Sequence, residues 1–210
     1  MQIFSDWDIC LLTDKKDLTE KTIKILKPED IFFPHWSWVI PRQIYSKYTC
    51  VVFHMTDLPF GRGGSPLQNL IVRGIKRTKI SAIKVEKGLD VGAVYLKRNL
   101  LLAGSATQIF TNASKIIFKQ MIPYILKNNP KSLPQKGKPV VFKRRTPEQG
   151  DISKLQDLQT VYDYIRMLDA ESYSAAFLET PGFKIEFINA KRKKGLIITQ
   201  ARITANKEKK

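Results

Sequence analysis

The stretch that most constrains the fold is a polar, glycine-rich loop at residues 54–66, which reads HMTDLPFGRGGSP. It follows an apolar run at residues 50–53 whose β-branched content is typical of a buried strand, and it precedes residues 67–72, whose spacing is typical of a helix. Open α/β sheets bind ligands in the crevice beyond the carboxyl ends of their strands. The loop therefore predicts a ligand site, with His54 as the last residue of the strand.

The apolar patterns around this loop indicate an α/β fold. Alternation and short apolar runs predict strands at residues 9–12, 30–33, 50–54, 80–85 and 95–102. Helical spacing predicts helices between and after them, at residues 18–27, 41–48, 66–75 and 105–127. This alternation of strands and helices predicts a doubly wound, mostly parallel, Rossmann-like sheet.

The C-terminal part has a different character. Residues 128–151 are rich in Pro, Lys and Gly, which indicates a connection with one short extended piece at residues 140–142. A helical pattern at residues 161–168 and three later apolar runs predict a small α+β appendage with an antiparallel meander. We therefore expect a larger α/β domain at residues 1–130 and a small helix-plus-hairpin region at residues 131–210.

Composition argues against several classes of protein. No run approaches the roughly 18 apolar residues of a membrane span, and acidic residues near the start argue against a signal peptide. Cys10 and Cys50 are too few for a disulfide framework, which favours a cytoplasmic location. The two histidines and two cysteines match no zinc-binding spacing, so no metal is expected.

The formal net charge of +17 at pH 7 leaves two interpretations open. An excess of Lys and Arg is the electrostatic footprint of a nucleic-acid binder. Basic runs at residues 143–145, 191–194 and 207–210, however, also fit a linker, a hairpin turn and a frayed tail. The sequence favours a lysine-rich solvated surface over a surface that binds a polyanion.

The loop resembles the signature loop of the formyltransferases that use 10-formyltetrahydrofolate, a family that includes methionyl-tRNA formyltransferase and the sugar N-formyltransferases. The residues that carry this resemblance are His54, Thr56, Leu58, Pro59, Arg62, Gly63 and Pro66. A second signature of the family is an aspartate in a D-x-G turn, which Asp90, Val91 and Gly92 supply. The resemblance implies the formyltransferase fold, with the catalytic domain at residues 1–130 and 10-formyltetrahydrofolate as formyl donor. The fold would be shortened at its N-terminus, because family members usually begin with one further strand and helix; either this protein lacks that unit or it begins at a later start codon.

The same resemblance assigns catalytic roles to His54 and Asp90. Formyl transfer to an amine needs a proton acceptor, for which an imidazole with a pKa of about 6.5 is suited, and donors for a developing oxyanion. Asp90 would fix the tautomer of His54 and stabilise its imidazolium form. Familiar members carry asparagine two residues before the histidine, where this chain has Val52. We expect His35 to replace that donor, and Thr56 and the backbone amides of the loop are weaker candidates. Alternatively, His35 forms part of the wall of the folate pocket.

The resemblance also implies which residues contact the folate, and they lie in loops that follow predicted strands. They are Phe33, Pro34, Trp36, Ser37, Arg62, Gly63, Lys87, Gly88 and Leu89. Trp36 and Trp38 would flank the pterin or aminobenzoyl group, or else belong to the core. Arg62 would anchor a phosphate or the folate glutamate, or else brace the loop.

The amino-acid sequences of the loop and of residues 31–38 and 142–152 are most similar to those of short sugar N-formyltransferases, including that of the pseudaminic-acid pathway. We therefore expect transfer to the amine of a nucleotide-linked amino sugar in bacterial glycan biosynthesis, without a membrane or nucleic-acid partner, and leave a homodimer open. Three alternatives stay open: a carrier-bound amino acid as acceptor, a non-catalytic polyanion-binding module, and methionyl-tRNA. The last is disfavoured because its enzyme usually carries a larger C-terminal barrel than residues 151–210 can build.

Overall fold

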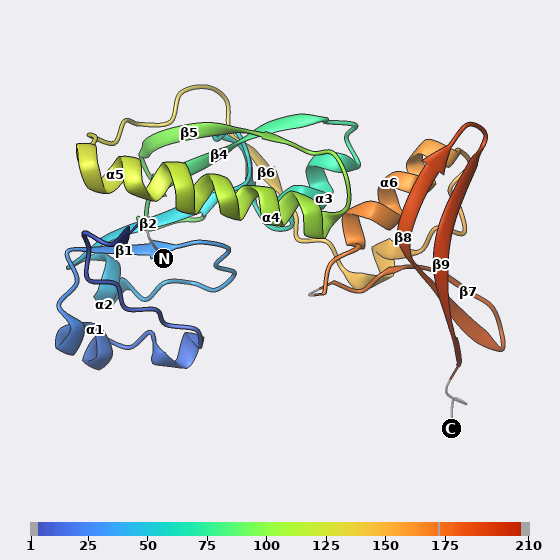
Figure 1. Cartoon of the computed structure of the whole chain (residues 1–210), viewed down its shortest axis with the longest axis horizontal. Coiled ribbons are helices and arrows are strands. Elements are labelled where there is room, and N and C mark those ends of the chain that lie inside the picture. The colour runs from blue at the N-terminus through green and yellow to red at the C-terminus, as the bar shows by residue number, and fades with distance from the viewer. Residues whose placement is uncertain (1–3, 172, 207–210) are drawn as a thin grey trace. The chain divides into compact units, whose positions relative to one another are not determined.

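The structure is a computed structural model that describes residues 4–171 and 173–206 (Figure 1). The chain forms two compact units, each assembled from separate segments. The first comprises Met1–Gly63, Thr78–Leu100 and Ala113–Val141, and the second Gly64–Arg77, Leu101–Asn112 and Phe142–Lys210. The domain boundary expected at residue 130 stays a prediction, and the tail expected at residues 207–210 lies outside the described residues.

The first unit is built on a four-stranded sheet with the order β1-β2-β4-β5. Its strands are β1 (Asp30–Phe33), β2 (Thr49–His54), β4 (Arg77–Lys84) and β5 (Val94–Leu101). β1 and β2 are parallel, with Phe33 opposite Val52, whereas β4 runs antiparallel to β2, with Ser81 opposite His54. The predicted α/β fold is confirmed. Its sheet mixes directions because the chain leaves the end of β2 and returns along β4 from that same end.

The N-terminal segment departs from the prediction. Residues 9–12 form no strand, and Ile9 and Leu11 are 56% and 77% exposed. A short 3-10 helix, η2 (Lys15–Asp17), and helix α1 (Glu20–Leu26) follow. Thr19 caps α1 by accepting a hydrogen bond from the backbone N–H of Thr22. The strand prediction was wrong because an apolar run needs a neighbouring strand, which the sequence pattern does not reveal.

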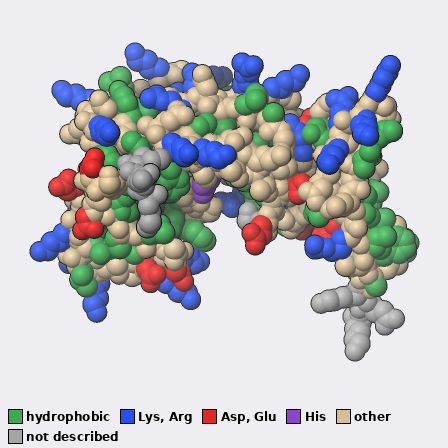
Figure 2. Space-filling view, in the orientation of Figure 1, with side chains coloured by type: hydrophobic (Ala, Val, Ile, Leu, Met, Phe, Trp, Pro, Cys, Tyr) green, Lys and Arg blue, Asp and Glu red, His purple; other side chains and the backbone are tan. Residues whose placement is uncertain are grey.

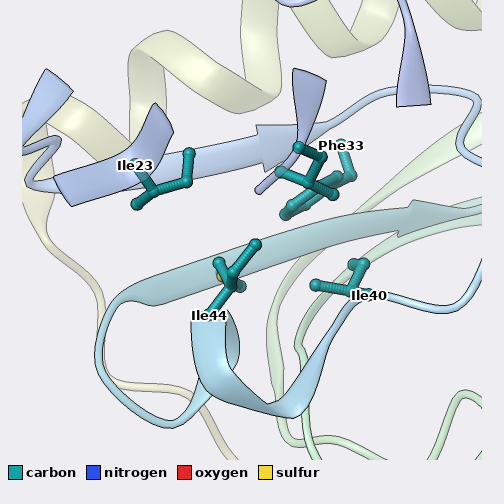
Figure 3. Packing of buried hydrophobic residues seen from close by; sticks show 6 residues of the cluster. Ile23, Phe33, Ile40 and Ile44 are labelled. Atoms are coloured by element: carbon teal, nitrogen blue, oxygen red, sulfur yellow. The ribbon is translucent and has the colours of Figure 1, made fainter. Parts of the chain in front are cut away.

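A hydrophobic cluster supports the parallel pair β1–β2 (Figure 3). Ile23 from α1, Phe33 at the end of β1, and Ile40 and Ile44 at helix α2 (Arg42–Tyr45) are all buried in it. Cys50 on β2 lies in the same cluster, where burial raises the pKa of its thiol to about 12. This packing holds the end of β1, and with it the start of the loop that follows Phe33.

One long helical run, expected at residues 105–127, extends through α4 (Ala106–Ile116), a π-helical turn η3 (Ile117–Met121) and α5 (Ile122–Asn128). At the turn the N–H of Ile122 donates to the carbonyl of Ile117, one residue further back than in an α-helix. Pro123 follows directly and has no N–H to donate. The π turn therefore lets the helix pass this proline without breaking.

The second unit contains helix α3 (Pro66–Ile71), a 3-10 turn η4 (Pro147–Gly150) and helix α6 (Leu158–Leu168). Strands β7 (Ala176–Glu179), β8 (Phe183–Lys193) and β9 (Leu196–Ala205) form an antiparallel sheet, which confirms the predicted meander. Ile165 of α6 packs with Ile152 and Ala176 in a buried cluster. Strand β3 (Phe60–Gly63) pairs with β6 (Val140–Phe142), and β3 and the first two residues of β6 belong to the first unit. Among the described residues no helix is long and apolar enough to cross a membrane.

Candidate active site

His54 stands at the end of β2, as predicted, and its side chain is buried. Its Nε2 atom lies 2.7 Å from the carbonyl oxygen of Gly61. Because a carbonyl oxygen can only accept, Nε2 must carry the hydrogen of this bond. The other ring nitrogen, Nδ1, lies 3.5 Å from Oδ2 of Asp90, so the structure brings the two predicted catalytic residues together.

The position of Asp90 depends on the tight D-x-G turn. Its backbone is left-handed, with φ +52°, and its Oδ2 accepts a hydrogen bond of 2.9 Å from the N–H of Gly63. Two residues later, a Cβ atom on Gly92 would lie 1.7 Å from the carbonyl oxygen of Lys84. No side chain fits there, which explains physically why the turn that presents Asp90 needs glycine.

The glycine loop folds back onto His54. Gly61 and Gly63 have φ angles of +78° and +101°, which favour glycine. The hydroxyl of Thr56 is fully buried and donates to Gly61 O over 3.2 Å, so this carbonyl receives hydrogen bonds from both Thr56 and His54. The loop conformation thereby fixes the orientation of the His54 ring.

The sequence analysis missed Gln135, which joins the two signature segments. Its Oε1 accepts hydrogen bonds from Nε and Nη2 of Arg62, at 3.1 and 2.8 Å. Its Nε2 donates to the carbonyl oxygens of Asp90 and Gly92, at 2.8 and 2.9 Å. Arg62 therefore braces the loop, one of the two roles expected for it. Gln135 lies in the predicted connection, where no pattern signals it.

His35 lies two residues beyond β1, in the turn that follows the last paired residues of β1 and β2, Phe33 and Val52. Its backbone is left-handed, with φ +54°, and its Nε2 is 2.9 Å from Oγ of Ser114. His35 is exposed as a whole residue, but the neighbouring groups partly remove its ring from water, and this desolvation lowers the pKa of His35. Val52 packs against the hydrophobic cluster instead of offering a donor. The role of His35 as the replacement donor stays a prediction.

The aromatic residues after β1 form a continuous group. The Trp36 ring lies 5.5 Å from Phe33 and 5.0 Å from Trp38, measured between centroids, both in edge-to-face geometry. Within the described part of the chain, the buried Nε1 of Trp36 has no hydrogen-bond partner. Such a donor fits a heteroaromatic ligand that carries acceptors. Pro34 and Ser37 belong to the same turn, whereas Lys87, Gly88 and Leu89 lie exposed on the loop before Asp90.

The described residues include no group of three or more His, Cys, Asp or Glu side chains that could hold a metal ion. The polar groups gathered at the end of β2 are therefore one imidazole, one carboxylate, a hydroxyl and backbone amides, the kinds of group used in acyl transfer.

Comparisons with known proteins extend this description. Residues 147–204 match the family model for the methionyl-tRNA formyltransferase C-terminal domain. The solved methionyl-tRNA formyltransferase from Clostridium thermocellum is 55% identical with a TM-score of 0.91, over 93% of this chain and 86% of that chain. The methionyl-tRNA formyltransferase from Campylobacter lari is 28% identical over 89% of this chain and 62% of its own length. This chain thus spans less than two thirds of that curated relative.

A more distant structure shares the fold. HypX from Aquifex aeolicus, solved in complex with tetrahydrofolic acid, is 19% identical with a TM-score of 0.68. The match covers 83% of this chain and 31% of that chain. At this identity the likeness concerns the fold alone.

The comparisons correct the predicted acceptor and partner. The sequence analysis favoured a nucleotide-linked amino sugar and argued against nucleic acid, but the relatives are named methionyl-tRNA formyltransferases, so both predictions were wrong. The particular likeness to the pseudaminic-acid enzyme is likewise not supported. The size of the C-terminal region misled the prediction. The solved methionyl-tRNA formyltransferase from Clostridium thermocellum is matched over 86% of its own chain, so a short C-terminal region does not argue against this family.

Proposed function

This chain belongs to the methionyl-tRNA formyltransferase family, and from that premise we propose that it transfers a formyl group from 10-formyltetrahydrofolate to the amino group of methionyl-tRNA. The bound folate supplies an activated formyl carbonyl. The protein must then receive a proton from the attacking amine and stabilise negative charge on the formyl oxygen. Cys10 and Cys50 are free thiols, which supports the cytoplasmic location that is part of this proposal.

The pairing of His54 with Asp90 is the observation that carries the proposal. Because Nε2 already holds a hydrogen directed at Gly61 O, Nδ1 is the ring nitrogen that can receive a proton. The carboxylate of Asp90, 3.5 Å away, would stabilise the resulting positive charge. The N–H of Gly63 holds that carboxylate oxygen in place. The amine proton therefore passes to Nδ1 of His54, which can return it to the folate nitrogen that leaves when its bond to the formyl carbon breaks.

The residues that contact the folate and the residue that donates to the oxyanion are proposed from the neighbours of each side chain. The Nε1–H of Trp36 has no partner among residues 4–171 and 173–206 and lies in a group of aromatic rings, which supports this turn as a folate contact. Of the two side chains expected to support the formyl oxygen, Thr56 donates to Gly61 O and Nε2 of His35 lies 2.9 Å from Oγ of Ser114, and we keep His35 as the proposed donor. Removing one such donor typically costs about 100- to 1,000-fold in rate.

The test is incubation of the purified chain with 10-formyltetrahydrofolate and methionyl-tRNA, followed by release and mass analysis of formylmethionine. Free methionine and uncharged tRNA are the acceptor controls. His54→Gln should lower kcat by at least about 100-fold with an unchanged melting temperature. A folded chain that formylates no methionyl-tRNA would refute the proposal, and tRNA binding without transfer would support the non-catalytic alternative.

A further inference from the structure

The positive charge of this protein is concentrated in one part of the chain. Residues 61–146 contain 18 Lys and Arg residues but only two acidic ones, Glu86 and Asp90. Residues 1–60 contain 7 basic and 8 acidic residues, and residues 147–204 contain 8 of each. The region that matches the C-terminal family model is therefore neutral, whereas residues 61–146 account for +16 of the net +17.

Within residues 61–146, one exposed face of the long helix carries lysines at regular intervals. Lys115 and Lys119 are one α-helical turn apart, Tyr124 follows five residues later across the π turn, and Lys127 lies one turn beyond. We call these four residues the lysine stripe. The opposite face is buried and apolar, at Ala113, Ile117, Met121, Ile122 and Ile125. In the face shown in Figure 2, Lys and Arg side chains lie over this helix.

Aromatic rings lie among these lysines. Phe118 and Tyr124 are 39% and 41% exposed, and the guanidinium of Arg98 lies 5.3 Å from the Tyr124 ring centroid. Exposed rings beside Lys and Arg are the combination with which proteins hold RNA, since bases stack on the rings and phosphates meet the cations. The stripe thus offers both kinds of contact.

The lysines of the stripe have no carboxylate partner in the described part of the chain. Among the described residues, two basic side chains from residues 61–146 form ion pairs with a carboxylate. These are Lys79 and Lys97, which both pair with Asp57, at 2.9 and 2.5 Å. Lys115 and Lys119 are exposed without such a contact, and Lys127 lies over the ring of Trp7. Their charges are consequently available to an external anion.

The stripe begins beside the catalytic edge of the sheet. Ser114, the residue before Lys115, is hydrogen-bonded to His35, which lies two residues after the end of β1, and β1 runs parallel to the strand that ends at His54. An RNA lying along the helix would therefore have one end close to the strand ends where the proposed chemistry occurs. This position connects the charged surface with the active site within one compact unit.

We propose that the lysine stripe binds the phosphate backbone of the tRNA, and that this surface supplies the electrostatic part of RNA binding in place of the neutral residues 147–204. The inference rests on the proposed function, because it takes tRNA as the acceptor. Each lysine that neutralises a phosphate contributes about one to the salt dependence of binding.

The experiment compares two triple variants of the full chain. K115Q/K119Q/K127Q removes the stripe charges, and K191Q/K193Q/K194Q removes the same charge from exposed positions at the β8–β9 turn. Binding of fluorescent uncharged tRNA is measured from low to moderate salt, together with KM for methionyl-tRNA. The stripe variant should bind roughly tenfold more weakly and lose about 2 to 3 from the slope of log K against log salt, with kcat unchanged. The control should match the unmodified chain.

Two further measurements keep the test decisive. K115R/K119R/K127R retains the charge and should retain both affinity and slope, so a loss there would point to altered folding and would refute the charge-based proposal. Equal losses in the stripe and control variants, or a larger loss in the control, would also overturn it. Absence of formylation by the unmodified chain would instead refute the proposed function, independently of where tRNA binds.

Discussion

Gln135 should be as important for activity as the signature residues that it connects. Replacing it with alanine removes two hydrogen bonds from Arg62 and two donated to the D-x-G turn. At roughly 0.5–1.5 kcal/mol for each bond, the local loss is on the order of 2–6 kcal/mol. Part of this loss will appear as displacement of Asp90, and a displacement of about 1 Å in a catalytic group can cost on the order of 100-fold in rate.

Two variants separate the contributions of the two contacts. Gln135→Glu keeps an oxygen for Arg62 but places a second oxygen against the carbonyls of Asp90 and Gly92, whereas Gln135→Ala removes both contacts. If the hydrogen bonds to the D-x-G turn are what orient Asp90, kcat should fall by about 10- to 100-fold in both variants. If the hydrogen bonds from Arg62 are what orient Asp90, kcat of the Gln135→Glu variant should stay close to that of the unmodified chain. The assay measures kcat and KM for folate and for methionyl-tRNA separately.

The positioning role has one clear refutation. If Gln135→Ala lowers the melting temperature but leaves kcat within about twofold in the fraction that is folded, then Gln135 stabilises the loop without orienting Asp90. Thermal melts of each variant, made alongside the kinetics, distinguish a partly unfolded sample from a folded but slow one.

Three other changes test the site. Asp90→Asn should lower kcat by at least about 100-fold, because the amide cannot stabilise a charged His54, and a normal kcat would remove Asp90 from the mechanism. Gly92→Ala should lower the melting temperature strongly, since its Cβ would lie 1.7 Å from Lys84 O, whereas Gly182→Ala, which meets no atom within 4 Å, should not. Desolvation of the ring lowers the pKa of His35 below its unfolded value. The unfolded chain therefore binds the proton more readily, and the free energy of unfolding should fall as pH drops below about 6.5. Thermal melts across pH should show this dependence reduced in His35→Gln, and an unchanged profile would contradict the assignment to His35.

The elements that the sequence predicted well are those specified by local pattern. β2 ends at His54 and β6 covers residues 140–142 as expected, since short apolar runs bounded by polar residues mark buried strands. Features set by distant partners were missed. Gln135 acquires its role from contacts with residues 43 to 73 positions away along the chain, and the sequence around Gln135 does not indicate these contacts.

The buried face of α1 shows the same limit. The pattern of residues 18–27 places four residues near one helical face: Leu18, Thr22, Ile25 and Leu26. In the structure Leu18 and Ile23 are buried, and Ile25 is 71% exposed. In a helix of seven residues, two apolar faces are nearly equivalent in pattern, so the position of the neighbouring strands decides which one is covered.

The π turn at Ile117–Met121 has a consequence for chain length. Such a turn holds one residue more than an α-helical turn, and the flanking segments keep the phase of an uninterrupted helix. Removing one residue inside it would restore α-helical hydrogen bonding and leave Ala113 and Ile125 facing the core. Because Pro123 follows directly and would meet the preceding α-helical turn, such a deletion would be accommodated only together with replacement of this proline.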